Sequence, residues 1–370
     1  MKQLKMECNI PLRIPQEVLS SIFKRLPVRT LIQLQCVCKD WKNLLNKPFF
    51  IQERLRYSAQ ENPSLLIHCL AVLNPLELYT FDSEMQVRPV ESIYLIEFSR
   101  GATVIGSVNG LVCVKSNYEF LNILVWNPAI SKFRLLTRKA NFSAKMGFGF
   151  CSMVKDYKVV SISNRGHGIS GPIRQVEVYS LSTYSWKEVE VGGLLDGVEI
   201  TSDGFGTNGA IFWFGYKKAN GRFLVSYYIA KEEFALIPSP ILAPELIDSL
   251  RNRFAVYENK LALLSHTTTG NHEYSLIDLW VMEEGKDRKS EERWSWTKKY
   301  SITHPYLLLP RVVWRNMIVC DAASEHEVVD HGLNMVLVNL TTNESKRFAF
   351  HKYGIAFHVF SYVESLVPVD

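Results

Sequence analysis

A unit of about 50 residues recurs along most of this 370-residue chain and limits its fold more than any other feature of the sequence. The unit opens with a turn residue and an apolar run. It is clearest at residues 109, 156, 208, 258 and 315, which are 47, 52, 50 and 57 residues apart. A second marker, the strand-like segment that follows each run, is spaced by 53, 49, 52 and 59 residues between its anchors Trp126, Tyr179, Tyr228, Trp280 and Asn339. Because two independent markers agree on the period, most of the chain is a repeat array.

Within each unit, short runs rich in Val, Ile, Tyr, Phe and Trp alternate with Gly, Asn, Asp and Ser turns, which is typical of antiparallel strands. A weaker copy at 64–81, SLLIHCL followed by LELYTF, brings the number of units to six. Repeats of this length with four strands each are typical of kelch-like propellers. We therefore predict an all-β propeller of about six blades, and we expect FHVFSYV at 357–363 to complete the first blade and close the ring.

Residues 14–50 follow a helical period instead. Pro15 suits the first position of a helix, where its missing N–H has no cost, and Pro27 ends that helix. Apolar residues between the two prolines recur on a 3.6-residue period, at Val18, Leu19, Ile22, Phe23 and Leu26. Two or three further apolar turns follow. A segment this small cannot bury so many large side chains against itself, at ~1.5–3 kcal/mol for each, so some of them are expected to face a partner.

The order of the short motifs in this segment, IP, Glu17, RLPVRTL and VCKDW, resembles an F-box. Ile14 replaces the usual leucine, and Gln33 and Gln35 stand where the family often has arginines. The resemblance implies that the head docks on a Skp-type adaptor, and through it joins the cullin and RING subunits of a ubiquitin ligase of the Skp-cullin-F-box (SCF) type. It also implies that the chain itself is not an enzyme.

Carried over residue by residue, the resemblance assigns adaptor contact or helix bracing to nine positions: Pro15, Val18, Leu19, Ile22, Leu26, Pro27, Leu31, Val37 and Trp41. The alternative for any one of them, Trp41 above all, is that the side chain fills the small internal core of the head.

The repeat array resembles the F-box-associated domain of plant F-box proteins, through GSVNGLVCV, VWNPAISKFRLL, DYKVV, VYSLSTYSW, LWVM, WSWTK and YVESL. It departs from that family at VSYYIAKEEF and in an insertion at 283–293. The predicted class is therefore α+β in two domains, a small all-α F-box head followed by an all-β propeller. The expected boundaries are 10–57 for the head, 58–63 for a linker and 64–370 for the propeller.

Composition excludes several other classes of protein. Apolar residues make up 47% of the chain, yet no run reaches the ~18 residues of a membrane helix, so we expect no membrane partner. The first 15 residues lack a secretory apolar core, which predicts a cytoplasmic or nuclear protein. Residues 1–60 hold 11 Lys and Arg against 4 Asp and Glu, but without interleaved aromatic residues, so nucleic acid is not an expected partner.

Three features of the sequence suggest a cofactor, metal or catalytic site, but the residues around each of them do not fit such a site. GHGISG at 166–171 fits a dinucleotide loop, but Pro172 and a strand follow it instead of a helix. His326 and His331, with Glu325 and Asp330, are spaced for neither a helix face nor a strand face, so they predict a polar loop and no metal site. The seven cysteines include no CxxC pair, and no nucleophile has a recognisable base. We predict no catalytic residue, no cofactor and no metal.

The sequence thus predicts a substrate receptor whose propeller captures an unidentified protein for ubiquitination. The alternative is a non-degradative protein- or glycan-binding propeller that is tethered through its F-box. Three segments are candidates for target contact: 163–174, 216–222 and 283–293.

Overall fold

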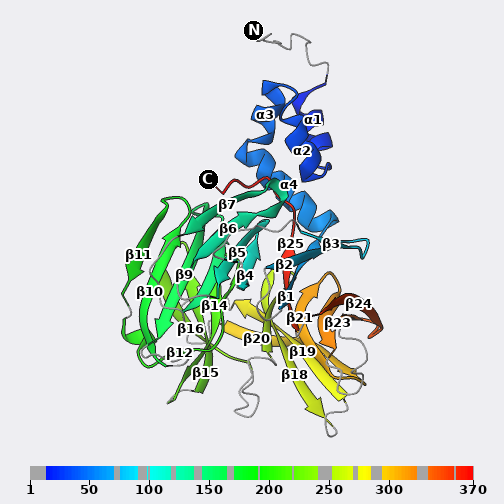
Figure 1. Ribbon diagram of the computed structural model, residues 1–370. Coiled ribbons are helices and arrows are strands. Elements are labelled where there is room, and N and C mark those ends of the chain that lie inside the picture. Colours follow the sequence, from blue (N-terminus) through cyan, green and yellow to red (C-terminus); the bar gives the residue numbers. More distant parts are fainter. Residues whose placement is uncertain are drawn as a thin grey trace.

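Over the residues that it describes, the computed structural model has four α-helices followed by a ring of six β-sheets (Figure 1). It describes residues 14–70, 76–90, 98, 101–117, 122–136, 144–164, 171–190, 192–218, 221–240, 252–269, 274–284, 294–322, 332–353 and 356–369. The helices are α1 (Gln16–Phe23), α2 (Val28–Leu34), α3 (Lys39–Leu45) and α4 (Pro48–Glu61). In the described part of the chain, none of them is both long and apolar enough to cross a membrane.

Prolines stand at the starts of three helices, whereas the sequence predicts a start at Pro15 and, at Pro27, the end of the preceding helix. Pro15 and Pro27 cap α1 and α2 with φ of −55° and −56°, and Pro48 occupies the first position of α4. A proline there loses no hydrogen bond, because the first N–H groups of a helix have no partner inside it. The three short helices and the start of α4 therefore pack into a compact head.

Blades 1 to 3 each contain four antiparallel strands. Their strands are β25 (Ala356–Tyr362), β1 (Ser64–Leu70), β2 (Glu77–Phe81) and β3 (Val87–Pro89); β4 (Ala102–Val108), β5 (Leu111–Ser116), β6 (Ile123–Asn127) and β7 (Lys132–Leu136); β8 (Lys145–Cys151), β9 (Asp156–Asn164), β10 (Ile173–Ser180) and β11 (Ser185–Val189).

Blades 4 to 6 complete the ring. Their strands are β12 (Glu199–Ile200), β13 (Phe205–Thr207), β14 (Ala210–Lys217), β15 (Gly221–Tyr228) and β16 (Glu233–Pro238); β17 (Asn252–Tyr257), β18 (Lys260–Thr269), β19 (Tyr274–Glu284) and β20 (Trp294–His304); β21 (Leu308–Trp314), β22 (Met317–Ala322), β23 (Gly332–Asn339) and β24 (Ser345–Tyr353). Six blades and a helical head confirm the predicted fold class.

The ring closes through the last strand of the chain. β25 pairs antiparallel with β1, from Ser64 opposite Tyr362 to Leu70 opposite Ala356, and so becomes the innermost strand of blade 1. The prediction that the segment at 357–363 completes the first blade is confirmed. Each of the six described sheets thus has at least four strands from this one chain.

Apolar side chains fill the space between every pair of neighbouring blades. The strand period of two sends alternate residues to opposite neighbours, so Leu65 and Ile67 pack against blade 6 while Leu66 packs against blade 2. Six such clusters account for all six pairs, including the pair of blades 6 and 1. The core is thus distributed around the ring, and each blade covers the apolar face of the next.

The repeated turn marker of the sequence corresponds to the hairpin between the first two strands of a blade. Asn109, Asn208 and Arg315 take left-handed φ values of 53°, 51° and 55° there, and Gly110 and Gly209 follow with φ of 80° and 75°. Asn and Gly tolerate this conformation better than other residues, and tight hairpins require it. The marker therefore recurs because the same turn recurs.

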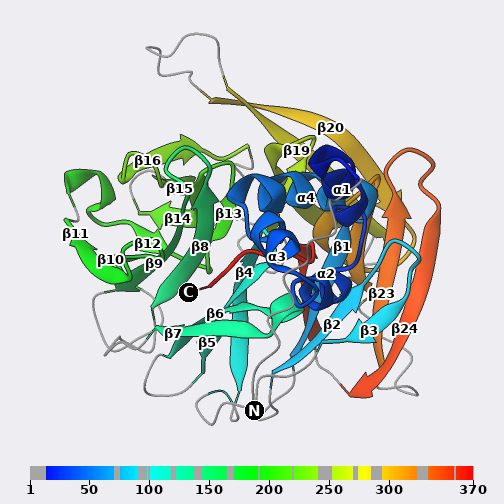
Figure 2. The ribbon, with the colours of Figure 1, turned by 90° about the horizontal axis from the view of Figure 1, so that it is seen from above.

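The head stands on one face of the ring (Figures 1 and 2). On that face the innermost strands end, and the hairpins between first and second strands turn back: Gly110 lies against Ser365, which follows β25. The short 3-10 helix η2 (Pro128–Ile130), between the third and fourth strands of blade 2, contacts α2 on the same face. We call this the head-side face of the propeller.

Candidate functional site

The head has a closed core and an exposed apolar surface. Seven of its large side chains are buried together with one residue from the C-terminal segment: Leu19, Phe23, Val28, Leu31, Leu44, Leu45, Phe50 and Leu366. Val18 and Ile22, one helical turn apart on α1, remain 47% and 45% exposed. Val37, after α2, is 59% exposed. The core of the head is complete without the exposed side chains of Val18, Ile22 and Val37.

The nine predicted adaptor positions separate into three groups. Pro15, Val18, Ile22, Pro27 and Val37 are exposed, and Leu26 and Trp41 are half-buried. The other two, Leu19 and Leu31, are buried with 6% and 0% exposure. The structure therefore makes five of the nine directly accessible, while Leu19 and Leu31 support them from the core.

Trp41 is placed for both of the roles considered for it, filling the head core and contacting an adaptor. Its ring meets the ring of Phe23 edge to face, with centroids 5.1 Å apart and an interplanar angle of 75°. That contact ties α3 to α1. Since the indole is also partly exposed, Trp41 both fills the core and borders the accessible surface.

Two exposed apolar residues of the head were missing from the prediction. Phe49, at the start of α4, is 71% exposed, and Ile14 is 44% exposed. A signal for Phe49 exists in the sequence: Phe49 and Phe50 are adjacent on a helix, so both cannot face the same core. Phe50 is the buried one, at 1% exposure.

The segment after β25, residues 363–369, leaves the propeller and packs against the head. We call it the C-terminal brace. Leu366 enters the head core, whereas Val367 and Val369 join the cluster between blades 2 and 3. The brace thus contributes to both cores at once, and the sequence prediction did not anticipate it.

Polar contacts hold the brace on both sides. On the head side, Arg54 of α4 donates from Nη1 to the carbonyl oxygen of Glu364 at 2.7 Å, and from Nη2 to that of Leu26 at 3.1 Å. On the propeller side, the buried Asn127 donates from Nδ2 to the carbonyl oxygens of Ser365 and Val367, at 3.1 and 2.8 Å. A buried charged or amide group with partners on two bodies fixes their relative orientation.

The chain connection between the head and the propeller is short. α4 continues to Glu61, and β1 begins at Ser64. Trp314 of blade 6 donates from Nε1 to the carbonyl oxygen of Pro63 at 3.2 Å. The head is therefore attached to the propeller at two places, through the C-terminal brace at Arg54 and through the short connection after α4.

The centre of the ring contains charged and titratable side chains. Lys115 pairs with Asp203 at 2.6 Å, and Arg311 pairs with Asp321 at 2.8 Å. Burial raises the pKa of Asp321 although Arg311 opposes the shift. Lys115, Asp203 and Arg311 all act electrostatically on His358 of the innermost strand β25, so these pairs lie near the centre of the ring.

Two histidines of blade 1 meet in the same region. His68 and His358 are opposite each other on β1 and β25, and their ring centroids are 6.0 Å apart. Burial lowers the pKa of His68 to about 3, with repulsion from His358 adding to it. Burial also lowers the pKa of His358 to about 4, with Arg311 adding to it. Both imidazoles are neutral at physiological pH.

Comparison with known families agrees with this geometry. The model of the F-box associated beta propeller domain matches residues 70–364, and an F-box-like model matches residues 12–56. The first match alone covers more than half of the chain. The chain belongs to the F-box-associated β-propeller family.

Similar proteins include several from Arabidopsis thaliana. A putative F-box protein is 25% identical, over 90% of this chain and 92% of its own length. The F-box protein CPR1 is also 25% identical, over 79% and 73%. An F-box/kelch-repeat protein is 23% identical, over 82% and 83%. The solved structure of TolB from Acinetobacter baumannii reaches a TM-score of only 0.45 at 9% identity, over 81% of this chain and 66% of TolB.

Membership of the F-box family has two general consequences. An F-box binds a Skp-type adaptor, and receptors of this F-box and propeller type are generally non-catalytic. Within the described residues, no group of three or more His, Cys, Asp or Glu side chains is arranged to hold a metal ion. The chemically suggestive loop residues 166–170, together with Glu325, His326, Asp330 and His331, lie outside the described residues.

The three candidate target segments of this F-box protein do not share one face. The connections β9–β10 and β14–β15 join second to third strands, and therefore leave the face opposite the head. The connection β19–β20 joins a third to a fourth strand and leaves the head-side face. The parts at 165–170, 219–220 and 285–293 lie outside the described residues, so only the ends of these segments are placed.

Proposed function

We propose that this protein is the substrate-recognition subunit of an SCF-type ubiquitin ligase. The head docks on the Skp-type adaptor, which links it to the cullin and RING subunits, and the propeller captures a protein target. The chain carries out no chemistry. The proposed modules are the head at 10–57, a linker at 58–63 that includes the last turn of α4, and the propeller at 64–370. The protein acts in the cytoplasm, the nucleus or both.

The observation that carries this proposal is the exposed apolar surface of α1. Val18 and Ile22 remain about half exposed although a complete core lies beside them on the same helix. Fully burying a side chain of this size against a partner contributes ~1.5–3 kcal/mol. A helix from an adaptor that covers both would therefore gain several kcal/mol without disturbing the core.

The double attachment of the head supports the second half of the proposal. A receptor accelerates ubiquitin transfer by holding the target near the activated ubiquitin, and this works only if its two ends keep a fixed relation. Arg54 and Asn127 bind opposite sides of the C-terminal brace. Such a connection is suited to positioning a target, whereas a loose tether is not.

The test is a Val18→Asp, Ile22→Asp double variant of the full chain. Both positions are exposed, so the thermal unfolding midpoint should stay within a few degrees of that of the unchanged protein. Binding to a purified Skp-type adaptor, measured by calorimetry, should weaken by about 100-fold or more. Val154→Asp is the matched control, because Val154 is 45% exposed on the propeller. Unchanged adaptor affinity in the double variant would refute the docking assignment.

The same variant separates degradation from simple binding. In cells, proteins that co-purify with the propeller should live longer when the double variant replaces the unchanged protein. Unchanged half-lives, together with a confirmed loss of adaptor binding, would favour the non-degradative protein- or glycan-binding propeller instead.

A further inference from the structure

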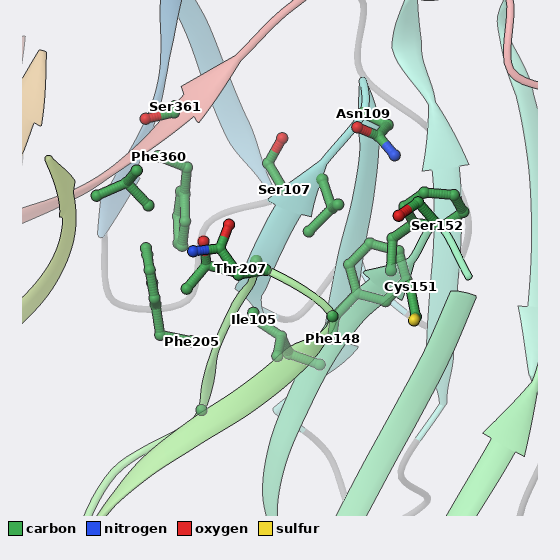
Figure 3. Close-up of a pocket in the computed structure, with 18 of the residues that line it drawn as sticks. Ile105, Ser107, Asn109, Phe148, Cys151, Ser152, Phe205, Thr207, Phe360 and Ser361 are labelled. Atoms are coloured by element: carbon green, nitrogen blue, oxygen red, sulfur yellow. The ribbon is translucent and has the colours of Figure 1, made fainter. Parts of the chain in front are cut away.

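A cavity of about 410 Å³ opens at the mouth of the central channel on the head-side face (Figure 3). It lies where the innermost strands β4, β8, β13, β17 and β25 end, so four of the six blades and the closing strand of blade 1 border it. Pockets that bind small molecules usually measure ~300–1,000 Å³. The size is therefore sufficient for a compact ligand.

The walls of this channel-mouth cavity include four phenylalanines beside aliphatic and polar side chains. Phe148, Phe205 and Phe360 come from three different blades and border it together with Ile105 and Val256, which makes an apolar enclosure (Figure 3). Aromatic rings of this kind favour a flat or ring-shaped apolar group through stacked and edge contacts.

Polar groups surround the enclosure, and all of them are neutral. Hydroxyl and amide side chains of Ser107, Ser152, Thr207, Asn208 and Ser361 line the cavity. Among the described residues at its border, none carries a formal charge. A charged ligand would lose its hydration without a counter-charge, at a large cost in free energy. The lining therefore selects an uncharged ligand with hydroxyl or amide groups.

One of these polar groups lacks a partner. The buried Oγ atom of Ser107 makes no hydrogen bond within the described part of the structure. Leaving a hydroxyl buried and unpaired costs ~1–3 kcal/mol. A ligand hydroxyl or amide that reached this atom would recover that cost.

The surroundings of the cavity favour a small molecule over a folded protein domain. The helices of the head stand above the same face of the ring (Figure 2). The C-terminal brace begins directly after Ser361 and Tyr362 and runs from the cavity border to the head. A protein surface that approached this mouth would meet the head first, whereas a compact molecule needs no such clearance.

We propose that the channel-mouth cavity is a binding site for an uncharged small molecule that combines an aromatic or similar apolar ring with hydroxyl or amide groups. The aromatic side chains enclose the ring, and the serine, threonine and asparagine groups orient its polar substituents. This site is separate from the adaptor surface on α1 and does not depend on the proposed ligase function.

The experiment uses the full chain and three defined probes. Saturation-transfer NMR measures the binding of p-cresol and benzamide, which are neutral, and of p-hydroxybenzoate, which is an anion of similar size. Ser361→Trp and Ser152→Trp fill the cavity from two different blades, and both positions are exposed on the surface. Ser295→Trp on the outer strand β20 is the matched control, since Ser295 is also exposed and lies far from the channel.

The neutral probes should bind the unchanged protein and the Ser295→Trp control equally, and the anion should bind at least about tenfold more weakly. Each cavity-filling variant that retains its circular dichroism spectrum should weaken neutral-probe binding by about tenfold or more. Two filling positions keep the test decisive if one variant fails to fold. Equal binding of the anion, no binding to the unchanged protein, or binding unaffected by either filling variant would overturn the proposal.

Discussion

Arg54 and Glu364 are 310 positions apart in the chain, yet Arg54 Nη1 donates a 2.7 Å hydrogen bond to the main-chain carbonyl of Glu364. The same guanidinium reaches the carbonyl of Leu26, between α1 and α2. Only 4% of Arg54 is exposed. A single side chain of α4 thus joins the beginning of the head to the end of the propeller, and it does so where water cannot substitute for it.

Replacing Arg54 should loosen this junction. Arg54→Met removes two part-buried hydrogen bonds from a charged donor, and each bond of this kind contributes ~1.5–3 kcal/mol. The free energy of unfolding in urea should fall by about that amount, and protease cleavage around residues 62–63 should accelerate. Arg56→Met is the control: the side chain of Arg56 is 74% exposed and pairs with Glu53 on the helix surface, so its loss should change stability by less than about 1 kcal/mol. Equal effects of the two variants would mean that Arg54 does not hold the junction.

Leu31 and Ile22 should separate folding from docking. Leu31→Ala creates a cavity in the head core and should destabilise the head by ~2–5 kcal/mol. Ile22→Ala removes an exposed side chain, so it should leave stability within about 0.5 kcal/mol and weaken adaptor binding by about tenfold. Urea unfolding and adaptor calorimetry on both variants check this. A large loss of stability in Ile22→Ala would show that the side chain belongs to the core.

The histidine pair predicts a loss of stability in acid. In the unfolded chain, a histidine has a pKa near ~6.5, whereas burial holds the pKa of His68 at about 3 and that of His358 at about 4. Above the pKa of the unfolded chain, both histidines are neutral in the folded and in the unfolded protein, so they do not make the free energy of unfolding depend on pH. As the pH falls below that pKa, the unfolded state binds protons that the folded state does not. Stability should therefore fall by up to ~1.4 kcal/mol per pH unit for each histidine, until the folded pKa is reached.

A His68→Asn, His358→Asn double variant isolates this contribution. Its free energy of unfolding should fall less steeply between about pH 7 and pH 5 than that of the unchanged protein. Lys115, Asp203, Arg253 and Arg311 surround His358 in both proteins, so their effects cancel in the comparison. Parallel pH profiles would show that the two imidazoles do not titrate as described.

Gly206 is expected to tolerate no side chain. It lies on β13, and a Cβ atom there would overlap the main-chain carbonyl of Phe148 on β8. Gly206→Ala should therefore force blades 3 and 4 apart and cost ~1–3 kcal/mol or more. Gly192→Ala is the control, since a Cβ atom at Gly192 meets nothing within 4 Å. Thermal unfolding of the two variants tests this, and similar midpoints would contradict it.

The repeat pattern was sufficient to predict the propeller, for a physical reason. Each blade needs the same left-handed hairpin and the same alternating strands, so residues such as Asn109 and Asn208 recur at the blade period. The closing strand was also predictable, because the first unit was incomplete and a strand-like segment remained at 357–363. Local chemistry repeated six times leaves a strong signal in the sequence.

The orientation of the head residues was less predictable. The apolar positions of α1 cover more than one face of the helix, and periodicity alone does not show that Leu19 faces inward while Val18 faces outward. The brace was missed because its partners, Arg54 and Asn127, are separated from it by most of the chain. Patterns in a single sequence reveal contacts between residues that are close together in the chain. The contacts of the brace join residues that are far apart in the chain, so no such pattern marks them.

The pairing of β25 with β1 also has a consequence for biosynthesis. The first blade emerges early from the ribosome with its inner edge uncovered, and it stays so until almost everything else has been made. Contacts between residues that are this far apart in the chain form late and slowly during folding. A product that terminates before residue 356 would lose the closing strand and the brace together, and with the brace it would lose Leu366 from the core of the head. Frameshift or nonsense alleles that end before residue 356 should therefore destabilise the propeller and the head together.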